Sequence, residues 1–465
     1  MNYEASLDYL TSLGQELRGV KFSLEPITTI LGSLGRPHLQ YPTAIVAGTN
    51  GKGSTSAILA SILKHAGYRT GLYTSPHLVR VNERMQVNGV EISDADFAQS
   101  FSEIHQAVDS LLAKNLLGFR PSFFEFLTAT AFLHFARARV DFAVLEVGMG
   151  GRLDATNITE PRVAVITNID LDHQQFLGTT RAEIAREKAG VIKPGRPVVS
   201  ACTDAEAAEV IRRRAAELGA PLVETAGLAR IANLRDRQGC YEFDFALNGD
   251  YFSNLLLPLL GRFQVDNAVA AVTAAWQLRQ DGLRITHAAI LEGLRHASWP
   301  GRLEQIGERP LVLLDGAHNP AGAREVASFV REHLAGRKLR LVYASMRDKA
   351  IAEISEILFP LAEEVFLTQP EQPRAATPEE ILAAIRCRTA RIVVEPEPAR
   401  ALERAIQASS VEDVVLAAGS LFLVGAIRKS RRAQQPPGAD PAARRQAAKS
   451  SPKCNPLPPS RPRKT

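Results

Sequence analysis

The chain reads Ala-Gly-Thr-Asn-Gly-Lys-Gly-Ser-Thr over residues 47–55, directly after the apolar run Thr43–Ala47. Apolar residues then recur every three or four positions from Ile58 to Ala66, before Gly67, which is typical of an amphipathic helix with a glycine at its end. A strand, a glycine-rich turn and a helix in this order form a phosphate-binding loop, because glycines let backbone N–H groups approach an anion and the helix N-terminus attracts negative charge. The stretch therefore predicts a nucleotide-binding α/β domain.

Individual residues of this loop have separate predicted roles. Lys52 would reach the β- and γ-phosphates, and a helix beginning near Ser54 would turn Ser54 or Thr55 toward Mg²⁺. Only two residues separate Gly48 from Gly51, so the loop is a variant of the general pattern. No Asn-Lys-x-Asp stretch for reading guanine occurs, which favours ATP over GTP. The alternative, a glycine-rich turn without a ligand, is disfavoured by a lysine beside Ser-Thr at a helix start.

Charge is unevenly distributed along the 465 residues. From residue 428 to 465 there are 11 Lys and Arg residues against Asp440 alone, a local charge of +10 within a chain whose formal net charge is +5. The other 427 residues thus carry about −5, which argues against a body that binds nucleic acid. We expect 428–465 to be a disordered basic tail, because its Pro-, Ala- and Arg-rich composition cannot form a core. Weak contact of the tail with RNA or a membrane is the alternative.

No targeting or membrane segment is evident. The first ten residues include Glu4 and Asp8 without a long apolar stretch, and nowhere do eighteen apolar residues follow one another. The four cysteines lack the spacing of metal ligands. We expect a cytoplasmic protein with no membrane association.

Apolar β-rich runs alternate with helical patterns, which predicts parallel sheets built from βαβ units. The fold class is α/β: a P-loop domain with a doubly wound parallel sheet over residues 1–297, then a smaller Rossmann-like α/β domain over 298–427. The turn at Trp299-Pro-Gly301 is the expected hinge, and 220–258 is expected to be a small antiparallel insertion that closes the first domain. The predicted strands are 43–47, 141–147, 162–167, 197–200, 311–315, 339–345, 364–368, 391–395 and 413–417.

In doubly wound sheets, ligands bind at the carboxyl ends of the strands, and several strand ends here carry polar residues. Glu146 closes one apolar run and is either a metal ligand or general base, or the partner of Arg152 or Lys188 in a buried ion pair. The next strand is followed by Thr167-Asn-Ile-Asp-Leu-Asp-His173, a dense group of oxygen and nitrogen ligands. His173 would lie at the mouth of the same sheet as the loop, which favours a functional role.

A helix with a Thr180-x-x-Glu183 capping box is predicted to run to Lys188 or Ala189 and to stop at Gly190. Lys188 then falls in the last turn. Spacing alone favours a structural role there, because a cation at this position complements the helix dipole by about 0.3 to 1 kcal/mol.

Seven blocks stand in order along the chain: Gly48-Thr-Asn-Gly-Lys-Gly-Ser-Thr55, Thr74-Ser-Pro-His-Leu78, Glu146-Val-Gly-Met-Gly-Gly-Arg-Leu-Asp-Ala-Thr-Asn157, Asp172-His173, Arg186-Glu-Lys-Ala-Gly-Val-Ile-Lys-Pro-Gly195, Asp315-Gly-Ala-His-Asn-Pro320 and Ala418-Gly-Ser-Leu421. Together they resemble the folylpolyglutamate synthase family, whose bacterial members are often also dihydrofolate synthases. The resemblance covers residues 1–427 and leaves out the basic tail. Seven ordered blocks make it specific, whereas any single block would be a weak signal.

The resemblance implies ATP-driven amide formation. A pterin-linked carboxylate is phosphorylated to an acyl phosphate, which the amine of L-glutamate then attacks; Lys52 and the loop amides would stabilise charge on the transferring phosphoryl group. It also implies Mg²⁺, with two ions, held directly or through water by Ser75, Glu146 and His173. Lys188 matches a lysine that CO₂ converts to a carbamate, which would face the metal as an anion.

Contacts with each substrate are implied in the same way. The expected substrates are ATP, 7,8-dihydropteroate, tetrahydrofolate derivatives and L-glutamate, and we expect the enzyme to be a monomer. Nucleotide contacts fall on Thr49, Asn50, Gly51, Lys52, Gly53, Ser54, Asn267, Arg302 and Asp315. The pterin site falls on Ser122, Phe123, Phe124, Glu125, Leu153, Asp154 and Ala155. His318, as a catalytic residue, and Ser420 would lie near glutamate. For 122–125, an ordinary helix start is the alternative to a pterin site.

Two competing interpretations remain. A peptidoglycan Mur ligase shares the ATP-domain layout and the amide chemistry, but the 47 residues before the loop are too few for its UDP-binding domain, and Asp315-Gly-Ala-His-Asn-Pro320 fits the folate branch better. A catalytically idle nucleotide-binding regulator is the other, and the presence of Lys52, Glu146, His173 and Lys188 argues against it.

Overall fold

Strand β1 (Thr43–Ala47) lies inside an eight-stranded sheet, between the parallel neighbours β5 and β6. Only β3 and β4 pair antiparallel with their neighbours, so the predicted doubly wound parallel sheet is confirmed. Across the sheet the order is β4 (Val90–Glu91), β3 (Met85–Val87), β2 (Thr70–Tyr73), β5 (Phe142–Glu146), β1, β6 (Val163–Ile166), β7 (Val198–Ser200) and β8 (Leu222–Glu224).

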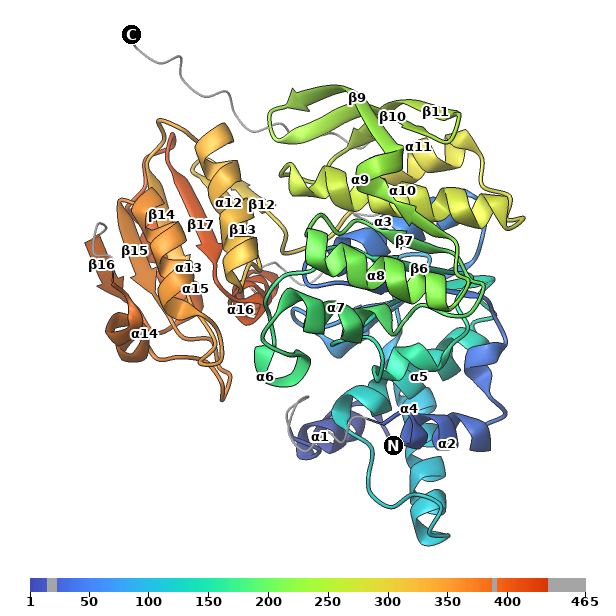
Figure 1. Cartoon of the computed structure of the whole chain (residues 1–465). Helices are drawn as coiled ribbons and strands as arrows, with labels where there is room; N and C mark the ends of the chain where they lie inside the picture. The colour runs from blue at the N-terminus through green and yellow to red at the C-terminus, as the bar shows by residue number, and fades with distance from the viewer. Residues whose placement is uncertain (15–22, 387–390, 434–465) are drawn as a thin grey trace. The chain divides into compact units, whose positions relative to one another are not determined.

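Helices cover both faces of this sheet (Figure 1). Ile45 and Leu145 are neighbours on one face, where they pack against α5 (Phe123–Arg137), α7 (Arg181–Ala189) and α8 (Ala205–Glu217). α10 (Phe263–Gln280) lies on the opposite side from α7 and α8 (Figure 1). The other helices of this part are α1 (Tyr3–Ser12), α2 (Glu25–Ser33), α3 (Lys52–His65), α4 (Asp94–Ala113), α6 (Gln174–Leu177), α9 (Thr225–Leu228), α11 (His287–Arg295) and the 3₁₀ turns η1 (Pro37–Leu39), η2 (Val81–Arg84) and η3 (Ala155–Ile158).

The predicted insertion is a separate three-stranded sheet in the order β11-β10-β9. Its strands are β9 (Ala229–Arg237), β10 (Cys240–Leu247) and β11 (Asp250–Leu257). Two-residue connections join consecutive strands, as in antiparallel hairpins.

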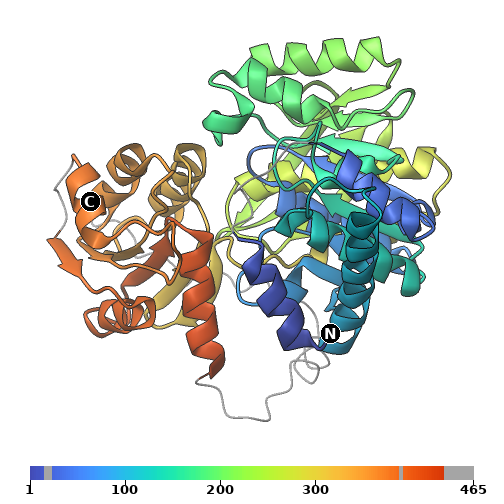
Figure 2. The same cartoon turned by 90° about the horizontal axis from the view of Figure 1, so that it is seen from below.

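A six-stranded sheet forms the core of the C-terminal part. Its only antiparallel pair is β12 with β13, and helices cover both faces (Figure 2). Its strand order is β12 (Glu304–Glu308), β13 (Leu311–Leu314), β17 (Val414–Ala418), β14 (Leu339–Tyr343), β15 (Glu364–Leu367) and β16 (Arg391–Val394). The helices are α12 (Pro320–His333), α13 (Ile351–Leu358), η4 (Phe359–Leu361), α14 (Pro378–Ala384), α15 (Pro398–Gln407) and α16 (Leu421–Ala433).

This computed structural model describes residues 1–14, 23–386 and 391–433, and the chain divides into two units. The first unit comprises Met1–Ala232, Phe245–Ser253 and Asp266–Leu294; the second comprises Asn233–Asp244, Asn254–Val265 and the chain from Arg295 onward. The insertion is therefore divided between the units rather than belonging to the first domain alone, and Cys240 of β10 belongs to the hydrophobic core of the second unit.

The expected basic tail overlaps the last helix. α16 continues to Ala433, and Arg428 forms an ion pair with Glu304, so 428–433 are helical. This part of the tail expectation is thereby corrected, because the apolar positions that end at Ile427 bury the helix and Arg428 is anchored by its partner. Residues 434–465 lie outside the described residues. Among the described helices, none is long and apolar enough to cross a membrane.

Candidate active site

Two glycines shape the phosphate-binding loop between β1 and α3. Gly48 and Gly51 both have positive φ, 147° and 84°. A Cβ on Gly48 would lie 1.8 Å from Thr167 Oγ1, and one on Gly51 would lie 2.2 Å from Asn267 Oδ1, so only glycine fits at either position. α3 begins at Lys52, two residues before the expected Ser54. Its first amides, which have no partner inside the helix, belong to the predicted nucleotide-binding residues.

The end of β6 holds the loop in place. Thr49 N donates to Asn168 O at 2.8 Å, and Asn50 N donates to Asn168 Oδ1 at 2.7 Å. Thr167 Oγ1 in turn donates to Asn50 O at 2.7 Å. Polar residues after β6 therefore lie against the P-loop, as expected for neighbouring strand ends. They hydrogen-bond to backbone atoms of the loop.

Two lysines converge on one carbonyl of the loop. Lys52 Nζ donates to Gly48 O at 3.1 Å and to Thr49 O at 3.0 Å, while Lys188 Nζ donates to Gly48 O at 2.7 Å. Lys188 is buried, and burial together with the charge of Lys52 lowers the pKa of its amine to about 7. The structure therefore places Lys188 at the P-loop. Its position in the last turn of α7 did not predict that the side chain is buried there.

The capping box that begins α7 is confirmed. Thr180 Oγ1 accepts from Glu183 N, and the Glu183 carboxylate accepts from Thr180 N. The helix ends at Ala189 with Gly190 as its C-cap. Arg152, considered as a partner for Glu146, instead forms an ion pair with Glu187 at 2.9 Å.

Glu146 ends β5, directly beside the P-loop strand. It is paired in register with Val46 of β1, it is buried, and its Oε2 accepts from Ser75 N at 3.1 Å. Ser75 follows β2, the strand on the other side of β5. The expected metal ligands Glu146 and Ser75 are therefore brought together at adjacent strand ends.

His173 lies beyond the end of β6 with a left-handed backbone, φ 50°. Its side chain is 29% exposed, and Nε2 lies 3.9 Å from Asp172 Oδ2. The residue precedes α6, and its side chain has access to solvent.

Glu146 and Ser75 lie side by side, and both carry oxygen atoms to which a divalent cation could bind. Within the described part of the chain, no three His, Cys, Asp or Glu side chains are grouped as a metal site. Mg²⁺ needs fewer protein ligands, since it keeps several waters and takes phosphate oxygens. The buried carboxylate of Glu146 beside Ser75 fits such an ion, whereas Lys188 fits only as a carbamate, because an amine offers no oxygen. Thr55 Oγ1 donates to Asn267 O at 3.5 Å and so faces α10.

The predicted pterin residues at 122–125 form the start of α5. Ser122 is the N-cap and makes a capping box with Glu125, whose pKa is raised by burial. These two side chains therefore cap the helix, as in an ordinary helix start. Phe123 and Phe124 are half-buried, and the Arg84 guanidinium lies 5.5 Å from the centre of the Phe123 ring. The aromatic faces are the part of this segment suited to a flat ring.

The loop after β5 meets Phe124. A Cβ on Gly148 would lie 2.6 Å from Phe124 Cζ, so the glycine makes room for the ring. Asp154 is buried and accepts from Met149 N at 3.0 Å and from Thr156 Oγ1 at 2.6 Å. Burial raises its pKa, and its hydrogen bonds fold the loop that carries Leu153 and Ala155.

Four predicted residues belong to the second unit. Asp315 is buried at the end of β13, where it accepts from Leu303 N at 2.8 Å and Ala317 N at 2.7 Å; burial raises its pKa, and Arg302 opposes this. His318 Nδ1 contacts Gly316 O at 2.8 Å. Ser420 is buried between β17 and α16. The structure thus brings Arg302, Asp315 and His318 together within this unit.

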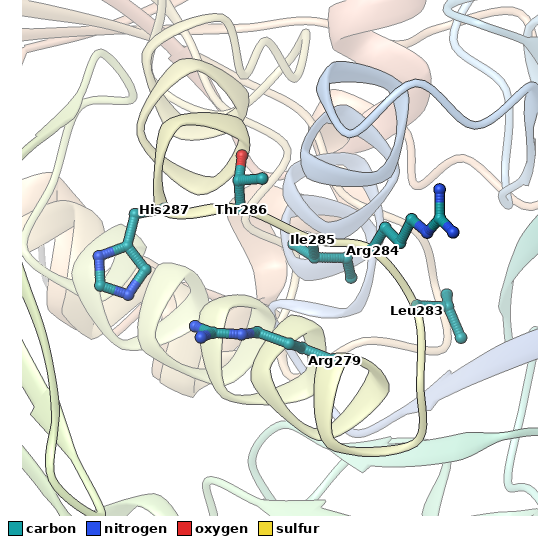
Figure 3. Close-up of a pocket in the computed structure, with 6 residues that line it drawn as sticks. All are labelled: Arg279, Leu283, Arg284, Ile285, Thr286 and His287. Atoms are coloured by element: carbon teal, nitrogen blue, oxygen red, sulfur yellow. The ribbon is translucent and has the colours of Figure 1, made fainter.

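A cavity of about 350 Å³ lies elsewhere in the first unit (Figure 3). Its lining is Arg279, Leu283, Arg284, Ile285, Thr286 and His287. Asn267 and Arg279 are twelve residues apart on α10, which is about 18 Å along a helix. This cavity is therefore separate from Asn267, the predicted nucleotide contact on α10.

Comparison with known proteins identifies the family. Residues 120–275 match the Mur ligase middle domain, and residues 301–421 match the glutamate ligase domain of Mur ligases. The dihydrofolate synthase/folylpolyglutamate synthase of Bacillus subtilis (strain 168) is 36% identical over 413 residues, which cover 88% of this chain and 95% of the relative. The chain belongs to the dihydrofolate synthase/folylpolyglutamate synthase family. The predicted resemblance is confirmed, and the protein is a ligase of this family.

Solved structures of family members agree with this assignment, each at 32% identity. Mycobacterium tuberculosis folylpolyglutamate synthase complexed with ADP has a TM-score of 0.86, covering 95% of this chain and 100% of that one. Escherichia coli FolC in complex with DHPP and ADP has a TM-score of 0.83, covering 92% and 98%. The Yersinia pestis CO92 bifunctional enzyme complexed with AMPPNP and Mn ion has a TM-score of 0.81, covering 93% and 98%.

Sequence reasoning missed some residues around this family's P-loop. Asn168 and Asp170 were noticed only as possible ligands, yet Asn168 binds the loop backbone and Asp170 binds Arg181. His77 was quoted within a motif, and its Nδ1 accepts from Arg84 Nε at 2.9 Å; burial, with the Arg84 charge, lowers the His77 pKa to about 3. No local sequence pattern predicts these contacts, because each joins residues from different elements or loops.

Proposed function

We propose that the protein joins L-glutamate to dihydropteroate, to reduced folates or to both, through an acyl phosphate formed with ATP. The observation that carries this proposal is the convergence of Lys52 and Lys188 on the P-loop beside the buried Glu146. Phosphoryl transfer relies on positioning and charge stabilisation rather than on covalent chemistry by the protein. A cluster of this kind supplies both.

Each element of the site has a part in the first step. The amides at the start of α3 and the Lys52 ammonium would hold the phosphates of ATP, as N–H groups and positive charge at a helix N-terminus do. Glu146 and Ser75 would hold Mg²⁺, with His173 contributing directly or through water. When bound, the ion neutralises charge on the phosphate oxygens and orients the acceptor carboxylate. Binding of AMPPNP and Mn ion by the Yersinia pestis relative supports a divalent metal.

Lys188 is proposed to act as a carbamate. Its amine nitrogen would attack the carbon of CO₂ and lose a proton, which leaves an anionic carbamate on the side chain. Only the neutral amine can react in this way, and burial beside Lys52 lowers the pKa of Lys188 enough to populate that form near pH 7. Its contact with Gly48 O would place the carbamate oxygens near the phosphate site.

The organic substrates are assigned to separate segments. Phe123 and Phe124 would stack on the pterin ring, and Asp154 would shape the loop opposite them. This is supported by the complex of Escherichia coli FolC with DHPP. Arg302 and Asp315 are proposed to contact the nucleotide, and His318 and Ser420 to lie near glutamate. A monomeric, cytoplasmic enzyme remains our expectation.

Product analysis tests this function. Purified protein would be given ATP, Mg²⁺ and L-glutamate with dihydropteroate or tetrahydrofolate separately, and the products identified by mass spectrometry alongside ADP release. We expect glutamate-dependent ADP and a product heavier by one glutamyl residue. Activity with tetrahydrofolate alone would restrict the protein to polyglutamylation, and absence of both products would contradict the proposal.

A further inference from the structure

Helix α7 is linked to two adjacent residues of the P-loop, directly at its C-terminal end and through Asp170 at its N-terminal end. At its C-terminal end, Lys188 Nζ donates to Gly48 O at 2.7 Å. At its N-terminal end, Arg181 reaches the next loop residue, Thr49, through Asp170. Arg181 and Lys188 are seven residues apart, or about 10 Å along the helix axis. The helix therefore bridges the loop rather than touching it at one point.

The connection at the N-terminal end runs through Asp170, whose Oδ1 also accepts from Leu171 N at 2.9 Å. Arg181 donates to Asp170 Oδ1 from Nε at 3.2 Å and from Nη2 at 2.9 Å. The backbone of Asp170 and the side chain of Thr49 bond reciprocally: Asp170 N donates to Thr49 Oγ1, and Thr49 Oγ1 donates to Asp170 O, each at 3.0 Å. A movement of Arg181 would thus act on Thr49 through one residue.

The position of Arg181 is unfavourable for a cation in the absence of these partners. It is the first residue of α7, where the helix dipole repels positive charge. Two carboxylates offset this repulsion: Asp170, and Asp204, whose Oδ2 lies 3.7 Å from Arg181 Nε. Asp204 is the N-cap of α8, so Arg181 also ties α7 to the helix packed beside it (Figure 1).

The C-terminal end of α7 is held by the loop that follows β5. Arg152 N donates to Glu187 O at 2.8 Å, and Asn157 Nδ2 donates to Gly190 O at 3.0 Å. Both ends of α7 are anchored, so the placement of Lys188 against Gly48 depends on the contacts at each end of the helix. A displacement at Arg181 is transmitted along a rigid element.

We propose that the Asp170–Arg181 pair is a positioning device that sets Lys188 against the P-loop, and so promotes formation and alignment of the Lys188 carbamate. This inference rests on the proposed function, because it assigns Asp170 and Arg181 to that same site. Neither residue is a catalytic group; both act through Thr49 and α7. Misplacement of a reacting group by about 1 Å can cost as much as a hundredfold in rate, so a pair at the surface can affect turnover strongly.

The test compares Arg181→Gln, Asp170→Asn and their double variant with Arg181→Lys as the conservative replacement. Arg212→Gln is the matched control, because Arg212 Nε lies 3.0 Å from Glu224 Oε2 with comparable exposure, in the same unit but away from the loop. Measurements are kcat, the KM values for ATP and folate substrate, thermal stability, and the ¹³C carbamate signal after addition of ¹³C-bicarbonate.

We expect Arg181→Gln and Asp170→Asn each to lower kcat about tenfold and to weaken the carbamate signal, with KM values within twofold. The double variant should be no worse than either single one, Arg181→Lys should recover part of kcat, and Arg212→Gln should match the unaltered enzyme. An unchanged kcat and carbamate signal in folded Arg181→Gln would overturn the inference while leaving the proposed function intact. An unaltered protein that forms no glutamate-dependent ADP would instead contradict the function. If Arg181→Gln does not fold, Asp170→Asn decides by the same criteria.

Discussion

At the scale of single residues, Gly51 shows how the absence of a Cβ allows the P-loop to pack closely against Asn267. Its φ of 84° is rarely adopted by other residues, and a Cβ would lie 2.2 Å from Asn267 Oδ1. We expect Gly51→Ala to weaken ADP binding about tenfold or more, because Asn267 would have to move and the loop would be strained. Titration calorimetry measures this directly. Gly67→Ala is the control, since Gly67 has a similar φ of 94° with nothing within 4 Å; equal affinities in the two variants would contradict the prediction.

Lys188 allows a comparison between two lysines whose pKa values are lowered mainly by burial. Lys188→Ala should reduce kcat on the order of 10²-fold, because metal-linked charge stabilisation is worth several kcal/mol, and small carboxylates should restore part of it. Lys193→Ala removes an amine that donates to Asn157 O at 2.9 Å and should keep kcat within a few-fold. Steady-state kinetics with and without formate make the measurement. Near-normal turnover in a folded Lys188→Ala protein would exclude the carbamate.

His38 should make the folded state sensitive to acid. It is buried in η1, and burial, with the charge of Arg36, lowers its pKa from 6.5 to about 4. Between these values the unfolded chain binds a proton that the folded chain does not, so the free energy of unfolding falls as the pH drops from 6.5 toward 4, by at most about 1.4 kcal/mol per pH unit. Urea unfolding at pH 7 and pH 5 should show a smaller difference for His38→Gln than for the unaltered protein. The same difference in both proteins would refute this.

At the scale of elements, apolar periodicity predicted most of the two large sheets. The predicted strands at 43–47 and 413–417 agree with β1 and β17 within one residue, because buried parallel strands are continuous apolar runs. β12, with the sequence Glu-Gln-Ile-Gly-Glu, was missed. It is an edge strand with one neighbour, so it needs few apolar residues. Its sequence therefore lacks the apolar run by which the other strands were predicted.

The candidate site was predictable to the extent that its residues lie at strand ends or within motifs. Glu146 and the residues after β6 were found from the rule that parallel strands share one binding edge. The burial of Lys188 against Gly48 O was not, because it depends on how α7 packs onto a loop 140 residues earlier. Side-chain spacing within one helix carries no information about such a contact.

The contact between the β5 loop and α5 gives an element-scale prediction. Gly148→Ala would push Phe124 by placing a Cβ 2.6 Å from Cζ, and Phe124→Ala would remove the ring. Both should raise the KM for dihydropteroate about two- to twelvefold, the value of one aromatic stacking contact of about 0.5 to 1.5 kcal/mol, with the KM for ATP unchanged. Kinetics with each substrate varied make the measurement, and Gly118→Ala, where nothing lies within 4 Å, is the control. Phe124→Ala should affect dihydropteroate more than tetrahydrofolate; equal losses would indicate a structural role for the ring.

At the scale of the whole molecule, the chain passes between its two units more than once. The domain boundary expected at 298 lies close to the change of unit at Leu294–Arg295, but segments 233–244 and 254–265 also belong to the second unit. The alternation of apolar and polar residues along β10 indicated a strand. It could not show which hydrophobic core the strand would join. These two segments belong to the second unit because Cys240 and Leu260 pack in its hydrophobic core.

Removal of the basic C-terminal segment tests whether charge outside the described residues matters for activity. A chain that ends at Ala433 keeps all of α16 and the Arg428–Glu304 ion pair, whereas one that ends at Arg428 would lose the last helical turn. Residues 434–465 contain seven Lys and Arg residues and one acidic residue, Asp440. We expect the shortened protein to keep kcat/KM within about twofold, or roughly 0.4 kcal/mol of transition-state stabilisation, because this composition cannot contribute to a core.

The measurement should use tetrahydrofolate with one and with several glutamates, at low and at physiological salt. Exposed charges are screened beyond about 8 Å at physiological ionic strength, so electrostatic attraction of an anionic substrate would appear mainly at low salt. A loss of kcat/KM that grows with the number of glutamates and disappears with salt, at unchanged thermal stability, would show that the basic segment attracts the polyglutamate chain. A loss independent of both would mean that the segment reaches the reacting groups, and either result would contradict the expectation that it is dispensable for chemistry.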